Sequence, residues 1–354
     1  MTHDFAPRRS DLTFAIDTAR AAGDLVMNHR RRGFDVERKS DVPDDFVTIA
    51  DREASELIIE RIRRHAPFDG VLSEEMADDE TRLAKRRVWI VDPIDGTKEF
   101  VHGSPDFAVS IGLTVDGEPR LGVVYAPATG DVYAGLDGVE KNGRTVGFSK
   151  RPVEDAVIAV SATEYERELT GTPLRGMRPS GSIALKLAKI AAGEADATFT
   201  INPRSEWDVC AGHALVAAAG GSYTFRDGAA IGYNAPDPAL RRGTIGGRGD
   251  VVAWLARELD RLAVAQQHLF VREGEAAFAL LPPELRGHPS VHVRTAGRAL
   301  ESAVALERRG EAYRVAYADG PARGVSFIMR NLRRSLSIPD APNFSESTTS
   351  DATE

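Results

Sequence analysis

The spacing of hydrophobic residues predicts two helices near the start of the chain. Apolar and small residues recur three or four positions apart over residues 11–32 and again over residues 54–62. Pro67 follows the second run and ends the helix, because proline cannot continue the backbone hydrogen bonding. A short strand is predicted after each helix, at residues 34–38 and 71–72.

The next part of the chain shows the patterns of an antiparallel sheet. Residues 88–91 form an apolar, mostly β-branched run typical of a buried strand. Three further strands are predicted at residues 108–115, 121–126 and 131–134. Asp116-Gly117 separates the first two of these three and is a strong hairpin signal.

Strands and helices alternate in the following segment. Strands are predicted at residues 157–161, 197–201, 222–225 and 244–245, and residues 178–182 are expected to form a loop. Helices are predicted at residues 183–191, 206–218 and 251–262. Residues 1–262 therefore predict a layered mixed α/β domain, with a helix pair over an antiparallel sheet (about 10–150) and an α/β half (151–262).

The pattern changes again at about residue 263. Strands are predicted at 268–271, 276–281 and 313–318, and a helix at 296–309, so that residues 263–338 would form a small α/β appendage without an indicated function. Residues 339–354 are rich in Ser, Thr, Asp and Glu and are expected to be disordered.

Composition narrows the class of protein. The chain has 354 residues, is 42% hydrophobic and 28% charged, and carries a net charge of −8, which argues against a general nucleic-acid binder. Its single cysteine, Cys210, excludes an intrachain disulfide and fits a reducing cytosol. Neither a signal-peptide core nor an apolar run of about 20 residues for a membrane span is present, so we expect a cytoplasmic protein.

The strand at 88–91 leads into Asp92-Pro93-Ile94-Asp95-Gly96-Thr97. Two carboxylates around a stiff proline can face one point, and near a strand end they need solvent, a capping role or a cation. Gly96 allows a close approach to a ligand, and Thr97 adds a hydroxyl and an amide. The same string also fits a turn that caps the next helix, and on this string alone the cap is the favoured interpretation.

Further acids stand where other predicted elements meet: Asp51, Glu74 and Asp208. Mg²⁺ prefers oxygen ligands and keeps several waters, so a few carboxylates and a carbonyl suffice to bind it. Two such ions can activate water and neutralise phosphate oxygens. For any one of these acids a solvated or capping carboxylate is the favoured interpretation, whereas all five together at element ends make a metal site the competing one.

Several segments together resemble the inositol monophosphatase superfamily. They are Leu72-Ser73-Glu74-Glu75, residues 89–97 (Trp-Ile-Val-Asp-Pro-Ile-Asp-Gly-Thr), and residues 207–212 (Trp-Asp-Val-Cys-Ala-Gly). The resemblance covers about residues 10–262. It implies an αβαβα phosphatase fold and lithium-sensitive phosphomonoester hydrolysis with two to three Mg²⁺ ions.

The resemblance also implies roles for individual residues. The implied metal ligands are Glu74, Asp92, the Ile94 carbonyl, Asp95 and Asp208. Asp51 would hold a further metal ion or its water, and Glu74 with Thr97 would orient and deprotonate the attacking water. The Gly96 and Thr97 amides would bind phosphate, as amides at a helix start do, and Asp45 and Thr48 would support these groups.

Subfamily detail resembles bacterial 3'(2'),5'-bisphosphate nucleotidases, which remove the 3'-phosphate of adenosine 3',5'-bisphosphate (PAP) or its sulfated form (PAPS). Thr97-Lys98-Glu99-Phe100 and Ala211-Gly212-His213-Ala214 carry this likeness. It implies substrate contacts by Gly181, Ser182, Lys186 and Arg204. Lys186 could instead be a solvated helix residue, and Arg204 part of a surface salt bridge.

Other substrates and roles remain open. Inositol 1-phosphate, histidinol phosphate and fructose 1,6-bisphosphate are alternative substrates, although a position that is acidic in inositol-binding relatives falls near Ile201, which argues mildly against inositol. A non-catalytic relative that binds nucleotide is a second alternative. We expect a small phosphorylated substrate and no nucleic-acid partner, and a homodimer, which is common in the family, stays open.

Overall fold

The computed structural model describes residues 5–34, 36–38, 46–78, 80–169, 174–265, 270–271, 292–293, 302–309 and 312–319. Asp45, one of the predicted supporting residues, lies outside these ranges. The chain divides into two compact units, residues 1–166 with 174–258, and residues 167–173 with 259–354.

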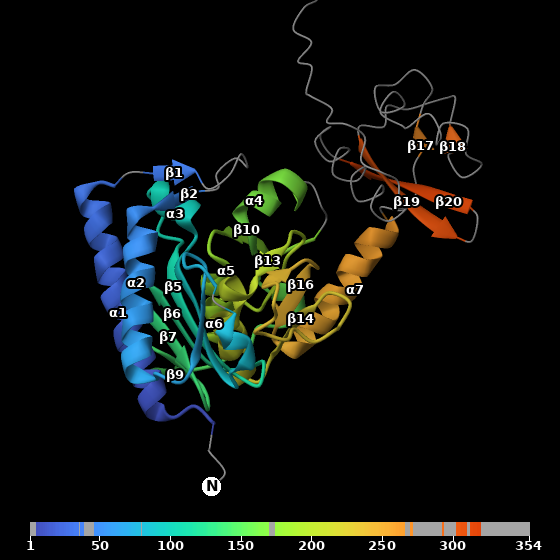
Figure 1. Ribbon diagram of the computed structural model, residues 1–354. Coiled ribbons are helices and arrows are strands. Elements are labelled where there is room, and N and C mark those ends of the chain that lie inside the picture. Colours follow the sequence, from blue (N-terminus) through green and yellow to red (C-terminus); the bar gives the residue numbers. More distant parts are fainter. Residues whose placement is uncertain are drawn as a thin grey trace, which may run out of the picture. The chain divides into compact units, whose positions relative to one another are not determined.

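A seven-stranded sheet lies at the centre of the first unit, with strand order β3-β4-β5-β6-β7-β8-β9 (Figure 1). Apart from the parallel pair β3 and β4, neighbouring strands are antiparallel, which confirms the antiparallel sheet predicted from the sequence. The strands are β3 (Gly70–Ser73), β4 (Arg87–Asp95), β5 (Ala108–Val115), β6 (Glu118–Ala126), β7 (Asp131–Gly135), β8 (Val139–Lys141) and β9 (Arg144–Val146).

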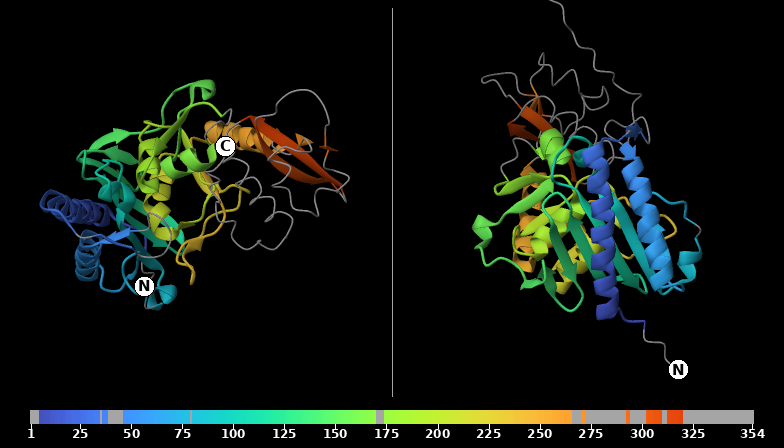
Figure 2. Two further views of the ribbon diagram at one scale, coloured as in Figure 1. Left: turned by 90° about the horizontal axis from the view of Figure 1, so that it is seen from above. Right: turned by 90° about the vertical axis from the view of Figure 1, so that its left-hand side faces the viewer.

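Helices cover both faces of this sheet. Helices α1 (Arg9–Arg32) and α2 (Ile49–His65) lie on one face, and α5 (Ile183–Ala191) and α6 (Glu206–Ala218) pack on the other (Figures 1 and 2). Successive residues of β4 point to opposite faces, so Trp89 joins the core under α1 and α2 while Ile90 joins the core under α5 and α6. Because both faces are covered, the β4 sequence reads as a continuous apolar run.

Helix α6 approaches the sheet closely because glycines face it. A Cβ atom on Gly122 would lie 2.1 Å from the Ala211 carbonyl oxygen, and one on Gly112 would lie 2.6 Å from Cys210 Sγ. Cys210 is fully buried in this contact. A larger side chain at either glycine would push the helix off the sheet.

A five-stranded sheet, with strand order β11-β10-β12-β16-β14, forms the second β layer. Helices α5 and α6 pack between the two sheets, and α7 (Gly249–Ala265), with Val251 and Leu255 buried, begins on the outer side of the second sheet (Figure 1). The layers follow the order αβαβα, as the resemblance implied. The strands are β10 (Ile158–Ser161), β11 (Met177–Ser180), β12 (Ala197–Phe199), β14 (Ser222–Phe225) and β16 (Thr244–Gly247).

Residues 178–180, predicted to be part of a loop, instead belong to β11, which pairs in parallel with β10. Pro179 disfavoured a strand in the sequence, but β11 is an edge strand, where a missing amide donor is tolerated.

Several short helices and strands complete the first unit. Two pairs of its short strands are antiparallel, β1 with β2 and β13 with β15. No helix among the described residues is long and apolar enough to span a membrane. The short elements are β1 (Val36–Arg38), β2 (Phe46–Thr48), β13 (Arg204–Ser205), β15 (Ala239–Leu240), α3 (Thr97–Val101), α4 (Ala162–Glu164), the 3₁₀ helices η1 (Thr81–Ala84) and η2 (Val153–Asp155), and the π-helical η3 (Tyr165–Leu169), which reaches into the second unit.

In the second unit, β17 (Phe270–Val271) pairs in parallel with β18 (His292–Val293), and β19 (Ser302–Arg309) pairs antiparallel with β20 (Ala312–Asp319). The helix predicted at 296–309 is therefore wrong over residues 302–309. Ala, Leu, Glu and Arg favour helix there, but pairing across a two-residue connection that contains Gly310 overrides this local preference. The strand predicted at 276–281 and the tail at 339–354 lie outside the described residues.

Candidate active site

Strand β4 ends in the two central carboxylates of the predicted site. Its pairing with β5 shifts register between Asp92 and Asp95, which indicates a bulge. Asp92 is buried and accepts a hydrogen bond from the Ile94 amide at 2.9 Å, so the carboxylate itself shapes the turn. Gly96 follows with φ of 98°, a conformation that favours glycine, and α3 begins directly after it.

Asp51 and Asp208 occupy the same position in two helices. Each is the third residue of its helix and closes a capping box with the residue before the helix. Asp51 Oδ2 accepts from the Thr48 amide at 2.8 Å and from Thr48 Oγ1 at 2.6 Å. Asp208 Oδ2 accepts from the Ser205 amide at 2.7 Å. The capping box holds each carboxylate at the N-terminus of its helix.

Thr97 connects α2 with the end of β4. Its Oγ1 lies 3.0 Å from Asp51 Oδ1 and 3.1 Å from the Ile94 carbonyl oxygen, and its single hydroxyl hydrogen can be donated to either acceptor. Glu74 follows β3, and its amide donates to the Val91 carbonyl at 3.4 Å, next to the end of β4. These contacts bring Asp51, Glu74 and Thr97 to the Asp92–Asp95 turn.

The acids at this point repel one another. Burial, followed by the charges of Glu74, Asp95 and Asp208, raises the pKa of Asp92 well above its ordinary value. Burial and the charges of Asp95 and Glu74 raise the pKa of Asp208 to about 7. Burial likewise raises the pKa of Asp51 and of Asp95. Several ionised carboxylates buried close together destabilise the folded state, and a cation bound between them would remove this cost in free energy.

The chemistry of these donors fits a hard divalent cation such as Mg²⁺. Carboxylates and the Ile94 carbonyl are the oxygen ligands that Mg²⁺ prefers, and the ion completes its shell with water. Among the described residues, however, no group of three or more His, Cys, Asp or Glu side chains is arranged to hold a metal ion by itself. An ion at this site would therefore also take oxygens from water, the backbone or a substrate.

Ser182 supports Asp95. Its Oγ donates to Asp95 Oδ2, which also accepts from the Ala184 amide at 2.6 Å, and Ser182 caps α5 by accepting from the Leu185 amide at 2.9 Å. Gly181 lies beside Glu99, whose Cγ would be 2.3 Å from a Cβ atom at this position. The structure thus places both residues next to the carboxylates, with Ser182 buried against Asp95.

Lys186 is buried, so the alternative of a solvated helix residue is wrong. Its ammonium donates to the carbonyl oxygens of Ser180 at 3.2 Å and Gly181 at 2.8 Å. Burial and the nearby Arg204 charge lower the pKa of Lys186 to about 8. The side chain braces the segment that carries Ser182.

Arg204 forms a salt bridge, but a partly buried one and not the surface pair considered above. Its guanidinium donates to Glu164 Oε1 at 2.8 Å, with the two side chains 21% and 2% exposed. Glu164 also accepts from the amides of Ile201 at 3.3 Å and Asn202 at 3.1 Å. No sequence motif marked Glu164, because its partners lie about 40 positions away.

Comparisons with known proteins agree on one family. The sequence-family model of the inositol monophosphatase family matches residues 8–268 of this chain. The inositol-1-monophosphatase of Bacillus subtilis is 35% identical over 221 residues, covering 59% of this chain and 83% of the relative. The fructose-1,6-bisphosphatase/inositol-1-monophosphatase of Thermotoga maritima is 36% identical over 224 residues, covering 60% and 84%.

Solved structures agree with the observed layers. The extragenic suppressor protein suhB from Bartonella henselae superposes with a TM-score of 0.62 at 31% identity, covering 71% of this chain and 99% of that chain. The Thermotoga maritima IMPase gives a TM-score of 0.62 at 31% identity, covering 72% and 98%.

Proposed function

The chain belongs to the inositol monophosphatase family of phosphatases, and we propose that it releases the 3'-phosphate of a nucleoside 3',5'-bisphosphate such as PAP or PAPS. The observation that carries the phosphatase chemistry is the set of buried, mutually repelling acids at the Asp92–Asp95 turn. Asp51 and Asp208 also cap their helices, but capping alone does not require so many repelling acids at one point, and the set suits metal-assisted phosphoryl transfer.

The proposed mechanism assigns a task to each residue. Asp92, Asp95, Asp208, Glu74 and the Ile94 carbonyl would hold Mg²⁺, which neutralises phosphate oxygens and activates water. Glu74 would accept the proton of the attacking water. The Thr97 hydroxyl, which donates a hydrogen bond to the Asp51 carboxylate or to the Ile94 carbonyl, would orient that water. The Gly96 and Thr97 amides would bind phosphate oxygens. Two or three ions and inhibition by lithium are expected.

Two cationic side chains near the carboxylates support a substrate with a second phosphate. Lys186 and Arg204 both act electrostatically on Asp95. The Thr97-Lys98-Glu99-Phe100 string and Ile201 support a nucleotidase over an inositol phosphatase. Turnover of PAP would give the protein a role in sulfur metabolism. Its single, buried cysteine suits the cytoplasm, and a homodimer stays a prediction.

Inositol 1-phosphate is the second candidate substrate, with fructose 1,6-bisphosphate beside it. The names of the Bacillus subtilis and Thermotoga maritima relatives favour these substrates. Histidinol phosphate is a further alternative, and a non-catalytic nucleotide binder would require that none of these substrates is hydrolysed.

A phosphate-release panel with Mg²⁺, with and without lithium, tests this proposal. We expect the highest kcat/KM for PAP and inhibition by lithium. Higher kcat/KM for inositol 1-phosphate or fructose 1,6-bisphosphate would overturn the substrate, and release from no substrate would overturn the activity.

Asp95→Asn tests the site itself. We expect kcat to fall by about 100-fold or more, since the substitution removes a metal-binding charge that acts on the transition state. Asp116→Asn is the matched control, because Asp116 lies in the hairpin turn after β5, half-exposed, and pairs with Arg86. Near wild-type activity of Asp95→Asn would contradict the metal assignment.

A further inference from the structure

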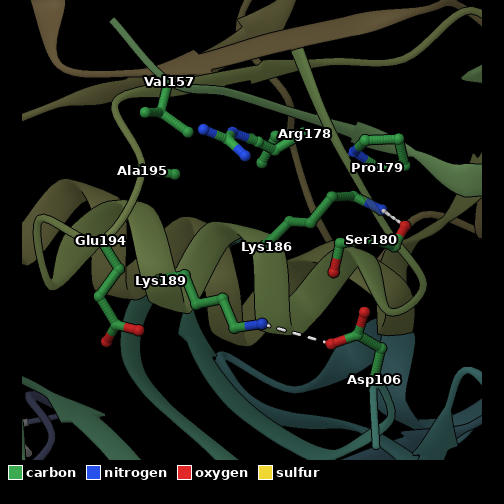
Figure 3. Close-up of a pocket in the computed structure, with 10 residues that line it drawn as sticks. Asp106, Val157, Arg178, Pro179, Ser180, Lys186, Lys189, Glu194 and Ala195 are labelled. Carbon is green, nitrogen blue, oxygen red and sulfur yellow. Dashed lines mark hydrogen bonds and ion pairs between the residues drawn. The ribbon is translucent and has the colours of Figure 1, made fainter. Parts of the chain in front are cut away.

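A pocket of about 320 Å³ lies beside the candidate active site, between helix α5 and the edge strand β11 (Figure 3). Val157, which precedes β10, and Ala159 of β10 contribute apolar lining. Its polar lining consists of Arg178, Ser180, Lys186, Lys189, Asp106 and Glu194.

The carboxylates of the pocket already have partners. Asp106 Oδ1 lies 3.4 Å from the Lys189 ammonium, an ion pair drawn in Figure 3. Glu194 Oε1 accepts from the Tyr133 hydroxyl at 3.0 Å and from the Lys141 ammonium at 2.9 Å. The pocket is therefore not built to bind a cation.

The groups left without partners are donors. The Arg178 side chain forms no hydrogen bond or ion pair within the described part of the chain, although its backbone belongs to the β10–β11 pairing. The Ser180 hydroxyl is buried and likewise lacks a partner there. The Lys186 ammonium donates two of its three N–H groups to the carbonyl oxygens of Ser180 and Gly181. The third N–H group can donate to a ligand. A guanidinium, a hydroxyl and an ammonium in one pocket match the acceptor oxygens of an oxyanion.

We propose that this pocket binds a phosphate group through Arg178 and Ser180, with Lys186 and Lys189 supplying additional positive charge. The group could come from two sources, the second phosphate of a bisphosphorylated substrate or free phosphate that acts as an effector. The pocket is distinct from the acid cluster at Asp92, and binding there requires no metal. The substrate source rests on the proposed function, whereas binding of free phosphate does not depend on the reaction that is catalysed.

The segment that lines the pocket also supports the acid cluster. Ser180 belongs to β11, and Ser182, two residues later, donates to Asp95. The Lys186 ammonium holds the carbonyls between them. A phosphate that attracts this ammonium changes the support of Asp95, so occupancy of the pocket should alter the Mg²⁺ concentration required for half-maximal activity.

Equilibrium binding of inorganic phosphate to the full chain tests the pocket. The measurement is made with a chelator present, which prevents metal-dependent phosphate binding at the acid cluster. We expect Arg178→Ala to bind phosphate about tenfold more weakly than wild type, or weaker still, because a charge-assisted hydrogen bond is lost. Arg175→Ala is the matched control, since Arg175 is exposed on the same segment but does not line the pocket, and its affinity should equal that of wild type.

Kinetics identify the source of the phosphate group. If Arg178→Ala raises KM for a bisphosphorylated substrate but not for a monophosphate, the pocket holds the second phosphate of the substrate. If neither KM changes but added phosphate no longer shifts the Mg²⁺ requirement, free phosphate is the ligand.

Equal phosphate affinity of wild type and Arg178→Ala overturns the proposal. Should Arg178→Ala fail to fold, Ser180→Ala takes its place, because it removes only the unpaired hydroxyl and is likewise expected to weaken binding. Unchanged affinity in that variant would be equally decisive against the pocket.

Discussion

Glu164 and Arg204 form a partly buried ion pair next to the acid cluster. Glu164 Oε1 gathers donors from the guanidinium and from two backbone amides, whereas Glu164 Oε2 and Arg204 Nε are buried without a partner in the described residues. The pair holds the guanidinium near Asp208, whose pKa the Arg204 charge lowers against the larger effect of burial. We infer that Glu164 positions this guanidinium, a role that the Glu164→Gln substitution tests.

Glu164→Gln should separate this role from simple folding. The substitution keeps the shape but removes the charge, so we expect the free energy of unfolding to fall by about 1–3 kcal/mol. We also expect KM to rise more than kcat falls, because a loosened Arg204 binds the substrate phosphate less well. Urea unfolding and steady-state kinetics measure the two effects.

Glu118→Gln is the control for this prediction, since Glu118 pairs with Arg120 on the surface with 67% of its side chain exposed. Such pairs contribute little, so neither stability nor KM should change. A Glu164→Gln protein as stable as wild type, with the same KM, would show that Arg204 needs no anchor.

Capping and metal binding were competing interpretations of the acids in the sequence, and the structure confirms the first without excluding the second. Asp51 caps α2 through Oδ2 while its Oδ1 reaches Thr97. One carboxylate has two oxygens with two lone pairs each, so a single residue can serve both purposes. The sequence alone does not show which of the two carboxylate oxygens makes which contact.

At the scale of elements, helix α6 carries a candidate ligand in its first turn. Ser205 precedes the helix and accepts from the Asp208 amide, while Asp208 accepts from the Ser205 amide. The position of the Asp208 carboxylate therefore depends on how well the helix begins.

Ser205→Ala removes the side-chain half of this capping box. We expect a loss of about 1 kcal/mol in the free energy of unfolding, the usual contribution of a serine cap. We also expect the Mg²⁺ concentration for half-maximal activity to rise, because the first turn frays around Asp208. Ser205→Thr retains the hydroxyl and should preserve both values. A Ser205→Ala protein with lower stability but unchanged Mg²⁺ dependence would separate the cap from the metal site.

Helices and strands with a regular spacing of hydrophobic residues were predictable from the sequence. Elements that depend on pairing with another strand were not. The apolar period of residues 11–32 led to α1, and the run at 88–91 to β4, because each pattern is set by the face that the element buries. Strand β11 was missed because Pro179 fits only at an edge, and β19 because its composition favours helix. In the same way, the Asp92–Thr97 motif revealed the acid cluster, whereas the pocket combines residues from 106 to 195 without any local pattern.

At the scale of the whole molecule, the acid cluster is a source of instability that a ligand can remove. Several carboxylates with raised pKa values are enclosed by one compact unit of the chain. An ion that binds the folded chain and not the unfolded one stabilises the fold by mass action, by about 2.7 kcal/mol at 100 times its Kd.

Mg²⁺ should therefore raise the Tm of the wild-type protein relative to protein in chelator. Asp92→Asn should abolish this shift, yet be at least as stable as wild type in chelator near neutral pH. The reason is that the folded state raises the pKa of Asp92, so its ionised form opposes folding at that pH. Thermal unfolding with and without Mg²⁺ measures both effects. A Tm shift of equal size in Asp92→Asn would place the stabilising ion elsewhere.

The contact between α6 and the sheet has a practical consequence for spectroscopy. Cys210, the single cysteine of the chain, is fully buried against Gly112, and burial raises the pKa of its thiol well above the ordinary value. A protonated, enclosed thiol reacts slowly with maleimides and other labels. Thiol-reactive labels should therefore react little with the wild-type protein. A single cysteine introduced at an exposed position such as Arg175 would carry a fluorophore or spin label selectively. A probe there, two residues before β11, would report on the strand that borders the pocket beside α5.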